Sequence, residues 1–145
     1  MNLSKHVTLA EFISSDSATR YGIKNDMDST QQQKAVDLCV NIFEPLREWL
    51  NKPIKINSGF RSLAVNKRVG GALSSQHLKG EAMDLQISSI EFNYIKDNLE
   101  FDQLIWEFGN DSEPSWIHVS FCKGRNRKQV LKAKKVKGKT VYSNY

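Results

Sequence analysis

Apolar and polar residues alternate in two short segments, residues 82–87 and 116–121. Alternation with a period of two is typical of β-strands that bury one face. Asp84 lies on the polar face of the first segment, and His118 lies on the polar face of the second. We therefore predict that two strands present Asp84 and His118 to one cleft, on the side away from the core.

A third alternating segment, residues 101–108, predicts a strand that carries Glu107 on the face opposite Leu104 and Trp106. A loop leads from this strand to the His118 strand, so the two can pair as antiparallel neighbours. That pairing would bring Glu107 close to His118. Because Glu107 lies among apolar neighbours, burial is expected to raise the pKa of its carboxyl group.

Apolar positions with a period of 3.6 residues predict the helices. The longest begins at the capping signal Ser29-x-x-Gln32, and Pro45 should kink it. Its apolar stripe, which we assign to the core, is Ala35, Leu38, Cys39, Ile42, Phe43, Leu46, Trp49 and Leu50. Shorter helices are expected after the caps Thr8 and Ser88 and at residues 16–21 and 63–69.

A short strand at residues 54–57 and a C-terminal hairpin around Lys137 and Gly138 complete the pattern. Together these elements predict an α+β fold in which helices flank a small antiparallel sheet. We expect one domain over residues 1–145, because a chain of this length can bury about two-thirds of its unfolded surface. We also expect a monomer.

Hydrophobic residues make up 39% of the chain, and the mean hydropathy of -0.51 is ordinary for a soluble protein. No apolar run approaches the roughly 18 residues that a membrane span needs, so none is expected. Residues 1–6 lack the apolar core of a secretory signal, and Cys39 and Cys122 form no obvious disulfide framework. We therefore expect synthesis in a reducing cytoplasm. Action on a cell wall would then need delivery by a holin, a virion or host lysis.

Positive charge is concentrated near the C-terminus. The formal net charge is +5, yet no acidic residue follows Glu113, and residues 123–139 carry nine Lys or Arg. The other residues carry 12 basic and 16 acidic side chains. Such a cationic segment could favour anionic wall polymers. We expect no specific binding of nucleic acid, because no base-stacking array or recognised binding motif is present.

A histidine and a carboxylate, His77 and Asp84, lie on either side of Gly80, which allows a tight turn between them. With His118 they offer three nitrogen and oxygen ligands, the usual number for a catalytic zinc that keeps a fourth position open. Cys122 has the strand parity of His118, but four residues of strand separate them by roughly 13 Å. We therefore do not expect Cys122 to be a ligand. An isolated His-x6-Asp pair is in itself weak support for a metal site.

Two polar residues near these ligands are candidates for substrate binding. Arg61 follows Gly59 at the end of a predicted strand. Its planar guanidinium could bind a carboxylate or a developing oxyanion, although an arginine in such a turn is ordinarily a solvated surface charge. Ser75 lies in the turn before His77 and could hydrogen-bond a substrate.

Several motifs occur in a fixed order between Ser58 and Ser120. They are Ser58-Gly59-Phe60-Arg61-Ser62, Asn66, Val69-Gly70-Gly71-Ala72, Ser75-x-His77-x-x-Gly80-x-Ala82-x-Asp84 and Trp116-Ile117-His118-Val119-Ser120. This ordered set resembles the zinc D-Ala-D-Ala carboxypeptidase family, peptidase family M15. The family includes D-Ala-D-Ala carboxypeptidases, D,D-dipeptidases and the L-alanyl-D-glutamate endopeptidases of phage lysins. The chain is most similar to the short single-domain members found in phages and bacteria.

The resemblance implies a zinc (Zn2+) peptidase with a hedgehog/DD-peptidase-like fold, whose substrates are the stem peptides of peptidoglycan. It also implies that His77, Asp84 and His118 hold the metal and that Arg61 binds substrate. The sequence leaves open whether the chain is a D-Ala-D-Ala carboxypeptidase or an endopeptidase. An alternative is a non-catalytic, zinc-containing wall-binding module on the same fold, as the hedgehog domain illustrates.

The general base has two candidates, Glu107 and Glu113. Many relatives carry a glutamate three residues before the last histidine, but that position here is Ser115. Trp116 is a second departure, because some relatives have a histidine there. The strand that ends at Glu107 resembles the segment of the hedgehog domain that carries its metal-site glutamate. We therefore favour Glu107 as the base, with Glu113 as the alternative.

Overall fold

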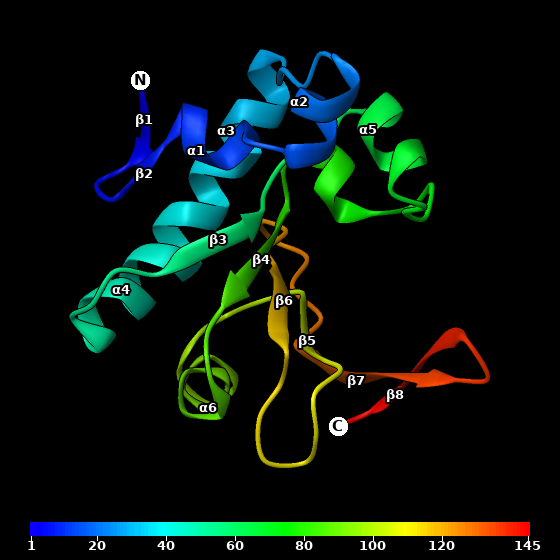
Figure 1. Cartoon of the computed structure of the whole chain (residues 1–145). Helices are drawn as coiled ribbons and strands as arrows, with labels where there is room; N and C mark the ends of the chain where they lie inside the picture. The colour runs from blue at the N-terminus through cyan, green and yellow to red at the C-terminus, as the bar shows by residue number, and fades with distance from the viewer.

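The structure is a computed structural model that describes all 145 residues and mixes helices with two β-sheets (Figure 1). The helices are α1 (Leu9–Ile13), α2 (Asp16–Tyr21), α3 (Ser29–Leu38), α4 (Glu44–Leu50), α5 (Leu63–Arg68) and α6 (Ser89–Asn98). The strands are β1 (Asn2–Ser4), β2 (Val7–Thr8), β3 (Lys55–Ser58), β4 (Ala82–Gln86), β5 (Gln103–Glu107), β6 (Trp116–Ser120), β7 (Gln129–Val136) and β8 (Lys139–Asn144). The predicted α+β class is therefore confirmed.

The main sheet has six strands in the order β3-β4-β6-β5-β7-β8. Four of its five strand pairs are antiparallel, as predicted, but β5 and β7 are parallel. The sheet is therefore mixed, and the purely antiparallel prediction is wrong. The parallel pair results from the connection after β6. Because β6 already pairs with one edge of β5, the chain crosses to the other edge of β5, where β7 runs in the same direction as β5.

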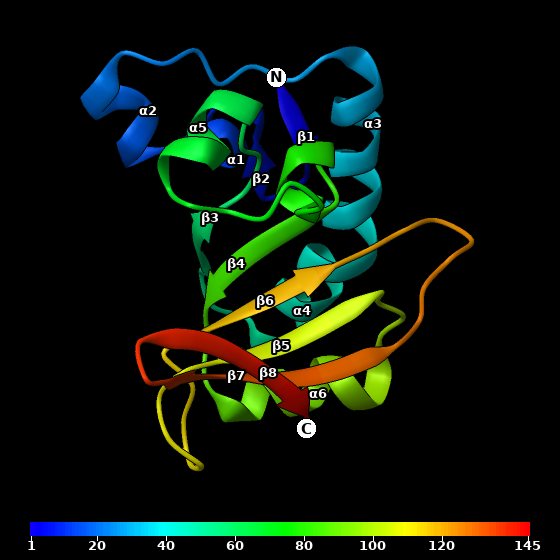
Figure 2. The same cartoon turned by 90° about the vertical axis from the view of Figure 1, so that its right-hand side faces the viewer.

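The hydrophobic core lies between one face of this sheet and the helices α3, α4 and α6, which stand behind the strands in Figure 2. Every second residue of β4, β5 and β6 points into the core. They are Met83, Leu85, Leu104, Trp106, Ile117 and Val119, all nearly or fully buried. The opposite face of the same strands is free of these helices, and it carries the polar residues predicted to bind metal.

The long predicted helix begins one residue earlier than its capping signal suggested, because Asp28 and not Ser29 is the N-cap, and it forms the capping box with Gln31. Before Pro45 the backbone widens into a π-helical segment, Cys39–Phe43, which accommodates the proline where a kink was expected. No helix is both long and apolar enough to cross a bilayer.

The prediction that Trp49 belongs to the core is wrong. Its side chain is 45% exposed and stacks on Tyr94 of α6, with ring centroids 4.1 Å apart. Trp49 lies in the last turn of α4, where the helix reaches the edge of the core. Its ring therefore covers a neighbouring helix at the surface and does not enter the interior.

Candidate metal centre

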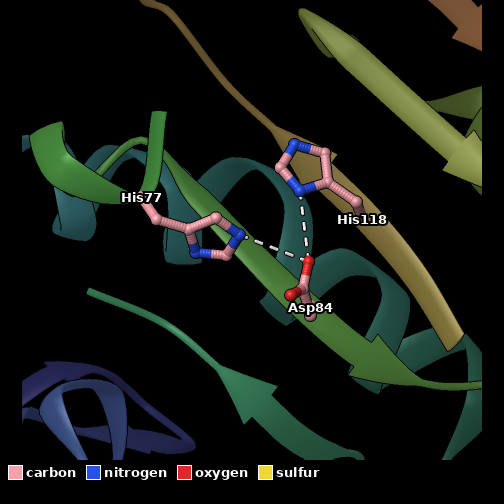
Figure 3. Close-up of side chains that lie close together, drawn as sticks. All are labelled: His77, Asp84 and His118. Carbon is pink, nitrogen blue, oxygen red and sulfur yellow. Dashed lines mark hydrogen bonds and ion pairs between the residues drawn. The ribbon is translucent and has the colours of Figure 1, made fainter. Parts of the chain in front are cut away.

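The two predicted strands pair so that Asp84 and His118 are direct cross-strand partners on β4 and β6. His77 reaches the same point from the 3₁₀ turn Gln76–Lys79 that precedes β4. The Asp84 carboxylate lies 3.3 Å from Nε2 of His77 and 3.1 Å from Nδ1 of His118 (Figure 3). One ligand atom from each residue lies within 4.8 Å of the others. The structure thus brings together all three residues that the sequence indicated.

A backbone carbonyl fixes the orientation of His77. Its Nδ1 lies 2.6 Å from the carbonyl oxygen of Gly59, and a carbonyl can only accept, so Nδ1 carries the proton. Loss of the proton from Nε2 would then leave a lone pair directed toward Asp84, as metal-binding histidines require. Gly59 is needed here because a Cβ at this position would lie 2.3 Å from the carbonyl oxygen of Phe12.

The turn between His77 and Asp84 also depends on a glycine. Gly80 ends the 3₁₀ turn with φ +77°, a conformation that side chains disfavour. An added Cβ would lie 2.5 Å from the carbonyl oxygen of Gln31 on α3. The side chain of Gln31 in turn donates to the carbonyl oxygen of Leu78. The long helix thus holds the turn that carries the first histidine.

Opposing effects determine the pKa of Asp84. Burial alone would raise this pKa, but the charges of His77 and His118 and the hydrogen bonds from their rings outweigh burial and hold it well below its usual range. Asp84 is therefore a carboxylate at any pH at which the protein would work. A charged oxygen beside two imidazole nitrogens is a suitable donor set for a divalent cation.

The three residues lie in a cleft of about 1210 Å³ that runs across the polar face of the sheet. The two predicted substrate-binding residues, Arg61 and Ser75, also line this cleft, next to His77. The Arg61 guanidinium donates to Oγ of Ser75 at 3.3 Å, and the Arg61 backbone amide donates to the carbonyl oxygen of His77 at 3.1 Å.

Arg61 is partly buried and does not extend freely into solvent. Its Nε is buried without a hydrogen-bond partner in the protein. Burial lowers the pKa of Arg61, and the nearby Asp84 charge opposes that shift. A guanidinium held beside the three candidate ligands is suited to bind an anionic or carbonyl oxygen.

Glu107 lines the same cleft from β5. The pairing of β5 with β6 places Ile105 opposite His118 and Glu107 opposite Trp116, as the antiparallel prediction required. Only 8% of Glu107 is exposed. Burial raises the pKa of Glu107 to about 7. Of the two smaller effects on this pKa, the charge of His118 lowers it and the charge of Asp84 raises it.

The alternative base, Glu113, is engaged elsewhere. Its carboxylate accepts hydrogen bonds of 2.8 Å from the backbone amide and the hydroxyl of Ser89, at the N-terminus of α6. Glu113 is not among the residues that line the cleft. The structure therefore gives Glu113 a capping contact and places Glu107 beside the candidate ligands.

A polar network around two buried carboxylates, Glu81 and Asp102, lies at one end of the cleft and was not anticipated from the sequence. Cys122 donates from its thiol to Glu81 at 2.6 Å, and Lys34 binds the other oxygen of Glu81 at 2.9 Å. Asp102 accepts two hydrogen bonds from the Arg127 guanidinium. These partners are 25 to 47 residues apart in the chain, so no local pattern could reveal them. Cys122 is thus outside the set of three converging groups, in agreement with the strand-length argument.

The donor set suits zinc. Two imidazole nitrogens and one carboxylate oxygen converge, and a carbonyl fixes the tautomer of one ring. A mixed α+β fold that gathers these donors in an open cleft, with a buried glutamate alongside, has the features of a metallopeptidase.

The chain belongs to peptidase family M15: the model of that family, described as Peptidase M15, matches residues 5–120. A segment of 42 residues is 50% identical to the zinc D-Ala-D-Ala carboxypeptidase of Streptomyces albus G. This similarity covers 29% of the present chain and 16% of that enzyme. The match to this curated relative is therefore short, whereas the family match includes all three candidate ligands and Glu107.

Proposed function

We propose that the protein is a zinc-dependent peptidase that hydrolyses the stem peptides of peptidoglycan. The observation that carries the proposal is the convergence of His77, Asp84 and His118 in one cleft with the buried Glu107. Family membership supports peptide hydrolysis. The similar segment in a zinc D-Ala-D-Ala carboxypeptidase supports the metal and the substrate class.

His77, Asp84 and His118 would hold the ion in this proposal. Zinc bound there supplies Lewis-acid polarisation of the scissile carbonyl and makes water more acidic. Glu107 takes the proton of the attacking water and passes it to the leaving amine. In the metal-free protein burial raises the pKa of Glu107 to about 7, which suits a group that exchanges protons near neutral pH.

Arg61 and Ser75 would orient the substrate. The guanidinium lies on the His77 side of the cleft. It can bind a terminal carboxylate or steady negative charge on the carbonyl oxygen during attack. Ser75 keeps Arg61 in position by accepting its hydrogen bond, and the same hydroxyl can turn toward a substrate.

We place D-Ala-D-Ala carboxypeptidase activity first and a related endopeptidase activity second, because the curated relative is named for the former. We also propose that the fold is hedgehog/DD-peptidase-like and that residues 1–145 form one domain. The connected core of 23 buried residues, which draws on elements from β1 to β6, supports the single domain.

The proposed function is tested by incubating zinc-loaded protein with purified muropeptides that end in D-Ala-D-Ala and weighing the products by mass spectrometry. Loss of one alanine residue indicates the carboxypeptidase, and cleavage within the stem indicates the endopeptidase. Metal-stripped protein is the matched control. If fully zinc-loaded protein cleaves no stem peptide, the function proposed here is wrong and the non-catalytic wall-binding module is preferred.

A further inference from the structure

The C-terminal hairpin, β7 and β8, lies beyond the residues matched by the family model. It nevertheless continues the main sheet past β5, as Figure 2 shows in orange and red. Leu131 of β7 and Thr140 and Tyr142 of β8 line the cleft that holds the three candidate ligands. The polar face of the sheet therefore extends onto the hairpin, and the cleft has a wall that family membership alone does not describe.

Strand register places Tyr142 in the same row as Glu107. Glu107 pairs with Ala133 across β5 and β7, and Ala133 pairs with Tyr142 across β7 and β8. Paired residues direct their side chains to the same face of a sheet, and adjacent strands are about 4.8 Å apart. The backbone of Tyr142 is therefore roughly 10 Å from that of Glu107, on the face that forms the cleft.

Ala133 lies between Tyr142 and Glu107 in this row and leaves room for their side chains to approach each other. Ala133 carries only a methyl group, so no long side chain of β7 separates the phenol of Tyr142 from the carboxylate of Glu107 in this row. The charges of Glu107 and Asp84 both raise the pKa of Tyr142, after the larger effect of its burial. The phenol is thus close enough to be influenced by both carboxylates, and it stays neutral and able to donate a hydrogen bond.

The other side of Glu107 is bounded by aromatic rings. Trp116 is its cross-strand partner on β6, and the Trp116 ring lies 5.3 Å from that of Phe108. Phe108 also lines the cleft. Its backbone φ of +58° is unusual for a residue with a side chain. No residue of this row is basic, although Lys135 of β7 donates to Oγ1 of Thr140 and lies over the Phe108 ring. Arg61 stands at the other end of the sheet order, beside His77.

We propose that Tyr142 is a further substrate-binding residue, which donates a hydrogen bond from its hydroxyl to an amide carbonyl of the bound peptide on the side of the ligands opposite Arg61. The ligand chemistry is that of a peptide segment. An amide carbonyl accepts from the phenol, and aliphatic side chains can lie against Phe108 and Trp116. This inference rests on the proposed function, since it assumes that a peptide occupies the cleft.

Tyr142→Phe tests the inference because it removes only the hydroxyl of a residue that is 55% exposed, so folding is not at risk. A neutral hydrogen bond to substrate is worth about a 3- to 10-fold change in affinity. We expect KM for a stem pentapeptide to rise by about that factor with kcat within about twofold of wild type. Zinc content should be unchanged.

Tyr145→Phe is the matched control. It removes the same group three residues away, but the Tyr145 ring packs against Phe92 and Trp106 on the core face of the sheet. Its KM and kcat should equal those of wild type. A second readout uses no catalysis: the Kd of a stem-peptide analogue with a reduced, non-hydrolysable scissile bond should rise about 3- to 10-fold in Tyr142→Phe and not in Tyr145→Phe.

Three results overturn the inference while leaving the proposed function intact, provided that the wild type cleaves stem peptides. They are an unchanged KM and Kd in Tyr142→Phe, an equal change in Tyr145→Phe, or a 100-fold fall in kcat with KM unchanged. The last would assign Tyr142 to the chemical step and not to binding. If the wild type neither cleaves stem peptides nor binds the analogue, both proposals fail together.

Discussion

Strands β4, β5 and β6 have two faces of contrasting character. One face packs under the helices and is wholly apolar, with residues such as Leu85 and Ile117 fully buried. The other carries Asp84, Glu107 and His118 into an open cleft. Because successive side chains of a strand point to opposite faces, neighbours in the sequence such as Ile117 and His118 have different roles. Stability and chemistry should therefore separate when single residues are changed.

The largest expected effect comes from the three proposed metal ligands. His77→Ala or His118→Ala should abolish both zinc binding and hydrolysis, because two remaining ligands hold zinc poorly. Asp84→Ala should weaken zinc binding similarly, whereas Cys122→Ser should retain zinc. Elemental analysis of the purified variants measures this directly.

The matched control on the other face is Ile117→Ala. It should keep one zinc per chain but lower the free energy of unfolding by about 2 to 5 kcal/mol, because it leaves a cavity in the core. Denaturant titration of His118→Ala and Ile117→Ala compares their free energies of unfolding, and elemental analysis compares their zinc contents. Full zinc occupancy in His118→Ala, or loss of zinc from a folded Ile117→Ala, would remove the proposed division between the faces.

The next largest effect concerns the proposed general base, Glu107. Glu107→Gln should retain zinc and fold but lose hydrolysis by at least about 100-fold, because the amide cannot take a proton from water. Steady-state kinetics on a stem pentapeptide measures the loss. Glu113→Gln should keep wild-type kinetics and lose up to about 1 kcal/mol of stability, since the hydrogen bonds of the Glu113 carboxylate go to Ser89 at the start of α6. An inactive Glu113→Gln beside an active Glu107→Gln would reverse the assignment of the base.

A smaller loss is expected from Arg61→Ala. A charge-assisted hydrogen bond to substrate or transition state contributes about 1.5 to 3 kcal/mol, which corresponds to a fall of roughly 10- to 100-fold in kcat/KM. Zinc content and the unfolding transition should stay close to those of wild type. If kcat/KM on a stem peptide is unchanged, the guanidinium does not contact the substrate despite its position in the cleft.

The last expected effect is a pH dependence of stability, which does not involve catalysis. Burial raises the pKa of Glu107 from 4.5 to about 7, so between these values the folded protein keeps a proton that the unfolded chain releases. The free energy of unfolding contributed by this group therefore falls as pH rises through that window. Glu107→Gln removes the effect.

This pH dependence is measured by denaturant titration of the metal-free proteins at pH 5 and pH 8. Relative to wild type, metal-free Glu107→Gln should gain at most about 3 kcal/mol in stability between those two values. An equal stability difference at both pH values would mean that Glu107 has an ordinary pKa and is more solvated than its position indicates.

Much of this contrast between faces could be predicted from the sequence, because a period of two along a strand is local information. Asp84, His118 and Glu107 were placed on their faces by alternation, and the structure agrees with each placement. Trp49 was misplaced because a helical stripe does not reveal where the core ends.

Contacts between distant segments could not be predicted. The parallel pairing of β5 with β7 depends on which edge of β5 is free, and this is a property of the whole sheet. The carbonyl of Gly59 that orients His77, and the position of Tyr142 in the cleft, depend on segments that meet only after folding.

The most direct test of the central claim is a crystal structure of the zinc-loaded protein with anomalous data collected at the zinc absorption edge. We predict one strong anomalous peak per chain, bound by Nε2 of His77, the carboxylate of Asp84 and Nδ1 of His118. Nδ1 of His77 should still donate to the carbonyl oxygen of Gly59. A peak bound by Cys122 and Glu81, or no peak between the three residues at full zinc loading, would contradict the assignment of the polar face as the metal centre.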